Sequence, residues 1–238
     1  MPAYLTRFYI LVAALLLAAC STTEVRQVPV IKAKAVLLLP LTSLHNELAQ
    51  AGHNVTLELT KALEKRRFAV INPSEEQTKL AVDQALAAAG AVYDPSIGQF
   101  LPMDRLVYIK SLIDYYGTQF EFEVLIQPEL LIRNASVVGD SASWDGAERS
   151  IELSNKPNTP YRPLKTVRGV SLKLSVYSQK GADLLHSYAG ISLPYTINYR
   201  VKPPEFDLKE QLFTVKEQRQ AVDGALKPFF YQVKYHAK

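Results

Sequence analysis

Apolar and polar residues along this chain recur with two periods, one typical of strands and one of helices. The run AVLLL at 35–39 has the length and unbroken hydrophobicity of a strand that is covered on both faces. From 44 to 67, apolar residues recur at steps of three and four, which predicts one amphipathic helix capped by Ser43 and weakened by Gly52. FAVI at 68–71 predicts a second short buried strand.

Two further helices and a long strand follow. Ser74 and Gln77 have the spacing of a capping box, and they predict a helix that ends at Gly90. Residues 104–116 predict another helix. The period then changes to that of a strand in FEFEVLIQPELLI. Within it, Pro128 requires an edge position or a bulge, because proline donates no hydrogen bond to a sheet.

The second half of the chain is mostly β-structure. The Asp145-Gly146 pair predicts a tight hairpin turn inside a hairpin and loop excursion near 130–165. Between 170 and 188, apolar and polar residues alternate on either side of a glycine-containing turn, which predicts a half-buried antiparallel hairpin. Near the C-terminus, the apolar spacing predicts a final helix that closes near Pro228.

This order of elements predicts an α/β fold, more narrowly α+β, in which helices sandwich a mixed β-sheet. The strands AVLLLP and FAVINP, the hairpin VSLKLSVYSQKGADLLHSYAG and the final amphipathic helix are similar to those of a periplasmic family. That family shares the fold of the TolB amino-terminal domain and includes lipoproteins of the CsgG, LpoB and PelC types. The resemblance covers roughly residues 34–230. It implies a single domain at 34–238 that works in the bacterial envelope.

The first nineteen residues predict an export signal. Arg7 supplies a positive start, and the apolar run at 8–18 suits a signal peptide but is shorter than the ~18 residues of a membrane span. LAAC at 17–20 resembles the lipobox of bacterial lipoproteins, which implies cleavage before Cys20. It also implies acyl chains, palmitate among them, on that cysteine, and two or more chains anchor a protein stably. The alternative is an ordinary signal peptide that leaves a free thiol.

The residues after the cysteine indicate where the protein is held. Ser21 follows Cys20, whereas an Asp at that position retains enterobacterial lipoproteins in the inner membrane. By this resemblance we expect the periplasmic face of the outer membrane rather than the inner membrane. Residues 20–33 include Pro29 and show no helical period, so they predict a short linker that keeps the folded body near the membrane.

The composition argues against several kinds of chemistry. Lipidation uses the only cysteine, which leaves no thiol for a disulfide, a nucleophile or a zinc site. The formal net charge is only +4, and the densest basic cluster, 65–67, falls at the end of a predicted helix, so no nucleic-acid partner is expected. The histidines lack metal-chelating spacing, and the chain has no P-loop, GxSxG or GxGxxG motif. No catalytic residue, metal site or cofactor is therefore predicted.

Two aromatic residues are candidates for contact with a partner. Trp144 falls at the predicted hairpin tip, and Tyr161 falls in a proline-rich loop. The alternative for Trp144 is that its indole folds back onto the sheet. The aromatic residues of FFYQVKY at 229–235 are predicted to close the core against the last helix.

Together these features predict a non-enzymatic, membrane-anchored periplasmic lipoprotein. It would act as an adaptor or assembly component of a secretion, polysaccharide-export or cell-wall system. Its partners would be the membrane, through its lipid, and either an envelope protein or further copies of itself in a ring or other oligomer. Two alternatives stay open: a small-ligand or lipid-binding accessory of a transporter, and a hydrolase without a recognisable motif.

Overall fold

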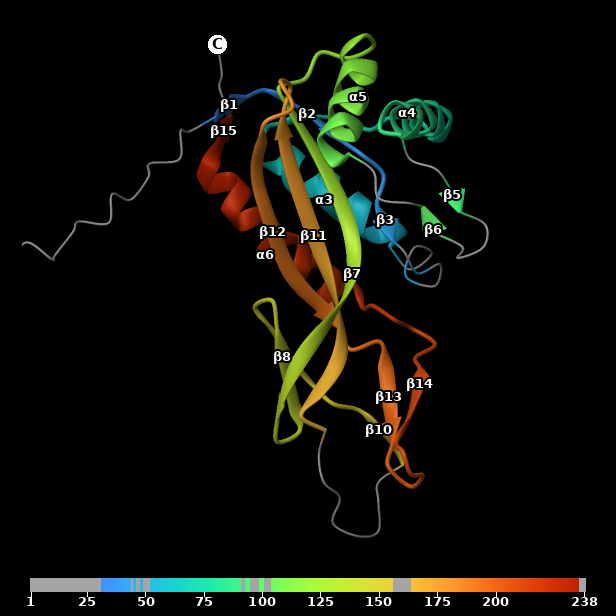
Figure 1. Ribbon diagram of the computed structural model, residues 1–238. Helices are drawn as coiled ribbons and strands as arrows, with labels where there is room; N and C mark the ends of the chain where they lie inside the picture. Colours follow the sequence, from blue (N-terminus) through green and yellow to red (C-terminus); the bar gives the residue numbers. More distant parts are fainter. Residues whose placement is uncertain are drawn as a thin grey trace, which may run out of the picture.

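The structure is a computed structural model that describes residues 31–43, 45, 48, 52–90, 93–94, 99–100, 104–155 and 164–235. Cys20, with the rest of the signal segment, and Tyr161 lie outside the described residues. Within the described part, helices pack on both faces of a mixed sheet (Figure 1). This confirms the predicted α/β class.

The main sheet has the strand order β12-β11-β7-β2-β4. These strands are, in that order, Asp183–Ser192, Thr166–Ser178, Val124–Val138, Ala35–Leu38 and Ala69–Ile71. β2 runs parallel to β4 and β7, whereas β11 runs antiparallel to β7 and β12. The short strands β3 (Thr42–Ser43) and β8 (Ser141–Trp144) pair with β7, and β9 (Ala147–Ser150) pairs with β8.

Three small sheets complete the β-structure that is described. They are β1 (Ile31–Ala33) with β15 (Val233–Tyr235), β10 (Leu153–Asn155) with β13 (Tyr195–Asn198) and β14 (Glu205–Leu208), and β5 (Tyr93–Asp94) with β6 (Gln99–Phe100). β1 pairs in parallel with β15. Residues 31–33 therefore belong to the folded body, although the sequence places them in the linker.

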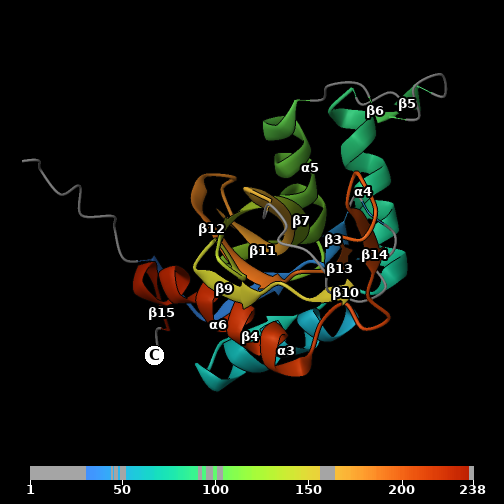
Figure 2. The ribbon, with the colours of Figure 1, turned by 90° about the horizontal axis from the view of Figure 1, so that it is seen from below.

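Two hydrophobic cores lie on the two faces of the main sheet (Figure 2). The described helices are α3 (His53–Lys65), α4 (Glu75–Ala88), α5 (Arg105–Gly117) and α6 (Val215–Gln232). The first core joins the sheet to α3 and α6, and the second joins it to α4 and α5. Leu59 of α3 and Leu226 of α6 are fully buried in the first core, and each contributes about 1.5–3 kcal/mol.

Local signals in the sequence place several helix ends and turns correctly. Ser74 and Gln77 form the predicted capping box at the start of α4, in which each side chain bonds the other residue's backbone N–H. Asp145 and Gly146 connect β8 to β9 with φ of 41° and 74°, the left-handed backbone that the predicted tight turn requires. These signals depend on few neighbouring residues.

The predicted helix from Ser43 to 67 does not run as one helix. α3 begins at His53 with Gly52 as its N-cap, and the Ser43 hydroxyl instead accepts a hydrogen bond from the His45 N–H at 3.1 Å. A Cβ on Gly52 would lie 2.1 Å from Leu41 Cδ2. The chain therefore uses this glycine for a close approach at the point where the helical period weakens.

Pro128 lies inside β7, a central strand, where the sequence predicted an edge position or a bulge. Its carbonyl accepts a hydrogen bond from Thr42 Oγ1 at 3.3 Å, so its backbone polar groups face the neighbouring β2–β3 segment. That neighbour is interrupted between Leu38 and Thr42. The missing N–H of Pro128 faces this interruption, and the proline fits without loss of a sheet hydrogen bond.

The 170–188 hairpin forms as β11 and β12, and its second face is buried in part, where the alternation predicted a wet face. Ser171, Ser175 and Tyr177, on the face expected to be wet, are at most 3% exposed. α5 packs over Tyr177, and the Asp145 and His186 side chains lie against the two serines. The alternation predicted the strands correctly but not the contacts that bury part of the second face.

The last helix continues past its predicted end at Pro228 to Gln232. A proline inside a helix costs about 3 kcal/mol, because it removes a hydrogen bond and crowds the preceding turn. Burial of Phe229, whose ring centroid lies 5.7 Å from that of Phe68, offsets much of this cost. Phe229 closes the core as predicted, whereas Tyr231 is 68% exposed.

Beyond the helices, β7 and β11 extend together into a second layer of β-structure, the distal lobe (Figure 1). This lobe consists of the far ends of β7 and β11 with β8, β9, β10, β13 and β14. Its own small core includes Trp144, Val167 and Ile197. The β7–β11 ladder is continuous, so one sheet supports both parts of the molecule.

Candidate functional site

The strands β7, β11 and β12 leave part of one sheet face without a covering helix among the described residues (Figure 1). We call this surface the open face. Its cross-strand rows are Gln127, Ser175 and His186; then Glu129, Lys173 and Tyr188; then Leu131, Ser171 and Gly190. α5 bounds the open face at one end, and the tip of the β8–β9 hairpin bounds it at the other.

The centre of the open face carries an ion pair and an exposed aromatic ring. Lys173 Nζ lies 3.0 Å from Glu129 Oε2, and these side chains are 12% and 28% exposed. Tyr188 is 39% exposed, and the Arg133 guanidinium lies 5.0 Å from the centre of its ring. These contacts hold the charged groups in fixed positions.

The boundary next to the distal lobe is also fixed by charged hydrogen bonds. Arg133 Nε lies 3.3 Å from Asp145 Oδ2, and the Ser171 hydroxyl donates to the same oxygen at 2.7 Å. At the opposite boundary, Arg105 Nη2 donates to the Tyr177 hydroxyl at 3.1 Å. The Tyr177 bond raises the pKa of the Arg105 guanidinium above its ordinary value, so this group stays cationic.

Ser175, His186 and Asp183 have the residue types of a hydrolytic triad. His186 Nδ1 lies 3.1 Å from Ser175 Oγ, and His186 Nε2 lies 2.6 Å from Asp183 Oδ2. Hydrolysis also requires N–H groups that stabilise the oxyanion beside the serine. Ser175 lies in the middle of β11, which is paired on both sides, so the nearby backbone amides are committed to the sheet. This geometry does not support acyl transfer.

Trp144 folds back onto the sheet, as the alternative interpretation of the sequence predicted. The side chain is 7% exposed, and its Nε1 donates to the Val170 carbonyl at 3.3 Å. A Cβ on Gly169 or Gly190 would come within 2.5 or 2.8 Å of the indole, so both positions require glycine. In this structure Trp144 therefore anchors the hairpin instead of offering an exposed ring to a partner.

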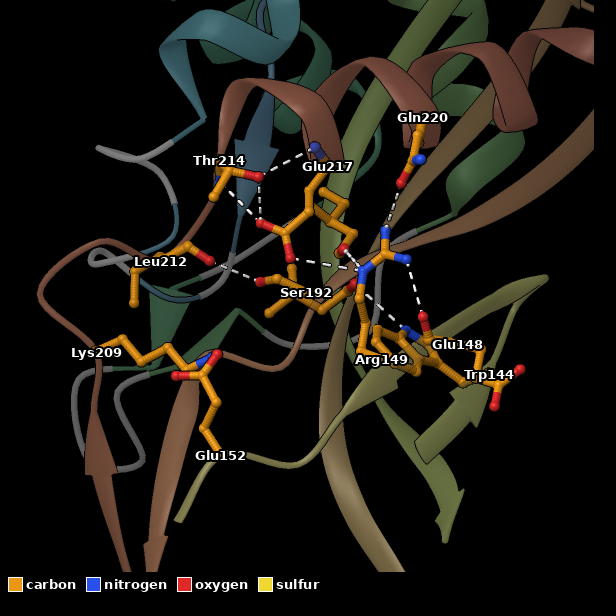
Figure 3. A network of polar contacts seen from close by, with 12 residues as sticks. Trp144, Glu148, Arg149, Glu152, Ser192, Lys209, Leu212, Thr214, Glu217 and Gln220 are labelled. Atoms are coloured by element: carbon orange, nitrogen blue, oxygen red, sulfur yellow. Dashed lines mark hydrogen bonds and ion pairs between the residues drawn. The ribbon is translucent and has the colours of Figure 1, made fainter. Parts of the chain in front are cut away.

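A network around Arg149 attaches the β8–β9 hairpin to the main body (Figure 3). Arg149 Nε donates to the Ile191 carbonyl at 3.0 Å, and Nη2 donates to Gln220 Oε1 at 3.2 Å. Nε also lies 3.5 Å from Glu217 Oε1. The other Glu217 oxygen accepts from the Thr214 N–H and hydroxyl at 2.8 and 2.7 Å, which caps α6. One arginine thus joins the hairpin, the edge strand β12 and α6.

Described residues line two hollows that open away from the open face. One, of about 400 Å³, lies in the distal lobe and is lined by Asn134, Thr166, Val167, Arg168, Tyr195 and Phe206. The other, of about 440 Å³, lies at the carboxyl ends of β2 and β4 and is lined mostly by apolar residues of 38–41 and 52–60.

The described residues contain no group of three or more His, Cys, Asp and Glu side chains that could hold a metal ion. None of the helices described has both the length and the hydrophobicity needed to cross a bilayer. Lipidation at Cys20 and partner contact by Tyr161 concern residues outside the described part and stay predictions.

Sequence reasoning missed the charged residues that organise these surfaces. Lys173 was placed on the polar face of its strand, but its partner Glu129 lies 44 positions earlier. Arg149 gives no signal in the sequence, because its contacts come from two distant elements, β12 and α6. Only the strand register brings these side chains together.

Comparison with known proteins finds no family model and no curated protein that matches this chain. A solved structure of a neuraminyllactose-binding hemagglutinin homolog from Helicobacter pylori is similar over 86% of this chain and 87% of that chain. The sequence identity is 10% and the TM-score is 0.34. Similarity at this level carries no argument about fold or function, so the function must be inferred from the residues of this chain.

Proposed function

We propose that this chain is a lipid-anchored periplasmic lipoprotein that acts, without enzymatic activity of its own, as an adaptor or assembly component of an envelope system. The open face carries this proposal. It presents fixed charges and an exposed aromatic ring, and its one triad-like cluster lacks donors for an oxyanion. Such a surface suits recognition of a protein, because fixed charges select the orientation of a partner and speed its approach.

Tyr188 and Arg133 are the residues on which we expect a partner to depend most. Tyrosine and arginine are enriched among the residues that dominate binding energy at interfaces. Tyr188 is 39% exposed, and the Arg133 side chain is 45% exposed yet already held by Asp145. A partner would therefore order few side chains on binding, which lowers the entropic cost of association.

The position of the first described strand supports anchoring through Cys20. Ten residues, 21–30, separate Cys20 and β1, and they reach about 35 Å when fully extended. β1 and β15 lie at the end of the body opposite the distal lobe (Figure 1). A lipid on Cys20 would hold this end beside the membrane and direct the distal lobe into the periplasm. Ser21 supports the outer membrane as the location.

We also propose that the fold is related to the TolB amino-terminal domain. Three features support this relation: parallel β2, β4 and β7 with intervening helices, the β11–β12 hairpin, and the final helix α6 packed on that hairpin. The distal lobe is an addition to this arrangement. Among the roles found in the TolB-like family, an adaptor close to the membrane agrees best with a linker of only ten residues, 21–30.

Palmitate labelling tests the anchor. Cells that express the full chain are grown with labelled palmitate, and their membranes are separated. We expect label on the protein in the outer-membrane fraction, and we expect Cys20→Ala to remove both the label and the membrane association. Label that persists in the variant, or an unlabelled wild-type protein, contradicts lipidation at this cysteine.

Site-specific crosslinking in cells tests the adaptor role. A photoreactive residue at Tyr188 on the open face is compared with one at Leu80 on α4, since these residues are 39% and 52% exposed. We expect one envelope protein to be captured in stoichiometric amount from position 188 and not from position 80. We expect Arg133→Glu to reduce this capture. Co-purification of lipid with no protein partner would instead support the transporter accessory.

A further inference from the structure

The hollow in the distal lobe has the composition of a ligand site. Its volume of about 400 Å³ lies within the range of roughly 300–1,000 Å³ that is typical of small-molecule sites. Strands β7, β11, β13 and β14 supply the residues named above as its lining, so the walls rest on sheet and not on loops. A strand scaffold holds side chains in precise positions.

One wall of the hollow carries three side chains that can form hydrogen bonds. Arg168 and Asn134 are cross-strand neighbours, and Thr166 projects from the same face of β11. All three residues are exposed, and among the described residues their side chains form no hydrogen bond or ion pair. Among the described residues that line the hollow, Arg168 alone is charged. An unpaired guanidinium beside an amide and a hydroxyl is ready to receive an anion.

The other wall is aromatic. Tyr195 and Phe206 meet edge to face, with ring centroids 6.3 Å apart and planes at 86°. Phe206 is 46% exposed, so an apolar ring faces water unless something covers it. The hollow thus combines one positive charge with an apolar surface large enough to hold a ring.

We propose that this hollow binds a small organic acid that has a single carboxylate attached to a ring with an apolar face. One guanidinium matches one carboxylate in charge and in planar geometry, whereas a doubly charged phosphate would keep an unpaired charge. Asn134 and Thr166 donate further hydrogen bonds, and Tyr195 and Phe206 cover the ring. Arg168 lies on the face of β11 opposite to Ser171, so this site is separate from the open face and independent of the adaptor function.

Calorimetric titration of the full chain, purified in detergent, tests the proposal with two acids and their neutral counterparts. Glucuronate is compared with glucose, and N-acetylphenylalanine with N-acetylphenylalanine amide. We expect at least one acid to bind about tenfold more tightly than its neutral counterpart, since a charge-assisted hydrogen bond provides this discrimination. Preference for glucuronate identifies a sugar acid as the ligand class, and preference for N-acetylphenylalanine identifies an aromatic acid.

Variants link the binding to the hollow. We expect Arg168→Ala to weaken the acid about tenfold, and Arg168→Lys to weaken it less, because lysine keeps the charge but not the planar pair of donors. Phe206→Ala removes the ring contact and should weaken both acid and neutral forms. Arg200→Ala, an exposed arginine of the same lobe that does not line the hollow, should have no effect. Circular dichroism confirms that each variant is folded.

Three results would overturn the proposal. They are no binding of either acid, equal binding of an acid and its neutral counterpart, and wild-type affinity in folded Arg168→Ala. Capture of a protein partner at Tyr188 affects none of these three measurements, because the two sites lie on different faces of β11.

Discussion

Gly169 lies in β11 directly beneath the indole of Trp144, the only tryptophan in the protein. A Cβ at this position would lie 2.5 Å from Trp144 Cε2 and 2.8 Å from Cδ2 and Cζ2. All three closest atoms belong to the same ring, and the glycine has no positive φ. In the folded state, Gly169→Ala therefore acts mainly on the indole, which it forces away from the strand.

The expected loss of stability follows from two opposing effects. Alanine restricts the unfolded chain more than glycine, which stabilises a strand interior by roughly 0.5–1 kcal/mol. Overpacking a well-filled core costs about 1–3 kcal/mol, and displacement of the indole also breaks its hydrogen bond to Val170. We expect a net loss of about 1–2 kcal/mol in the free energy of unfolding.

Intrinsic fluorescence measures the displacement directly, because all tryptophan emission comes from Trp144. We expect the emission maximum of Gly169→Ala to move to longer wavelength as the buried indole meets water. Urea unfolding followed by circular dichroism should give the corresponding loss of stability. Gly117→Ala is the matched control, since no atom lies within 4 Å of its added Cβ and its φ is not positive.

A double-mutant cycle separates the indole from every other effect of the added methyl group. In a Trp144→Ala background the contact is absent, so Gly169→Ala should be neutral or slightly stabilising. A wild-type emission maximum and urea midpoint in Gly169→Ala would refute the steric conflict with the indole. The same loss of stability in the absence of the tryptophan would refute it as well.

Three further changes test the polar contacts. Arg149→Met removes the bonds that join the β8–β9 hairpin to β12 and α6, and urea unfolding should show a free energy of unfolding lower by about 1.5–3 kcal/mol. Arg200→Met, at an exposed arginine, is the control and should change this free energy by less than about 0.5 kcal/mol. Equal effects of the two substitutions would contradict the network. Ser74→Ala removes the N-cap of α4 and should cost about 1 kcal/mol by the same assay, and an unchanged midpoint would contradict the capping box. The hydrogen bond from Arg219, and to a smaller extent that from Lys61, lowers the pKa of Glu58 below its ordinary value of 4.5. These two bonds therefore stabilise the folded state above pH 4.5, and this stabilisation is lost as the pH falls through the lower pKa of the folded state. The urea midpoint of Glu58→Gln should therefore lie below that of wild type at pH 7, with a gap that shrinks in acid; a gap independent of pH would contradict this linkage.

The sequence predicted those features that a few adjacent residues decide. The capping box at Ser74 and the turn at Asp145-Gly146 depend on side chains and backbone preferences within four positions, and both are present. The strand at 35–39 also forms, because unbroken hydrophobicity suits a strand covered on both faces. Fold class follows from the order of such elements.

Features that depend on contacts between distant segments were predicted poorly. The helix end at Pro228 was wrong because packing of Phe229 against Phe68 outweighs the local effect of proline. The position of Pro128 depends on an interruption in a neighbouring strand about 86 residues earlier. The open face and the distal hollow arise from strand register, which no pattern within one segment determines.

The β7–β11 ladder gives the molecule a fixed internal length. The two strands pair at thirteen consecutive positions, from Val124 with Ser178 to Ser136 with Thr166. At a rise of about 3.3 Å per residue the ladder spans roughly 40 Å, without a linker between the helical part and the distal lobe. The ladder therefore sets the distance between the helical part and the distal lobe. A ligand of the distal lobe would lie at a fixed distance from β1, the first described strand. The distal lobe would change its orientation only together with the rest of the body.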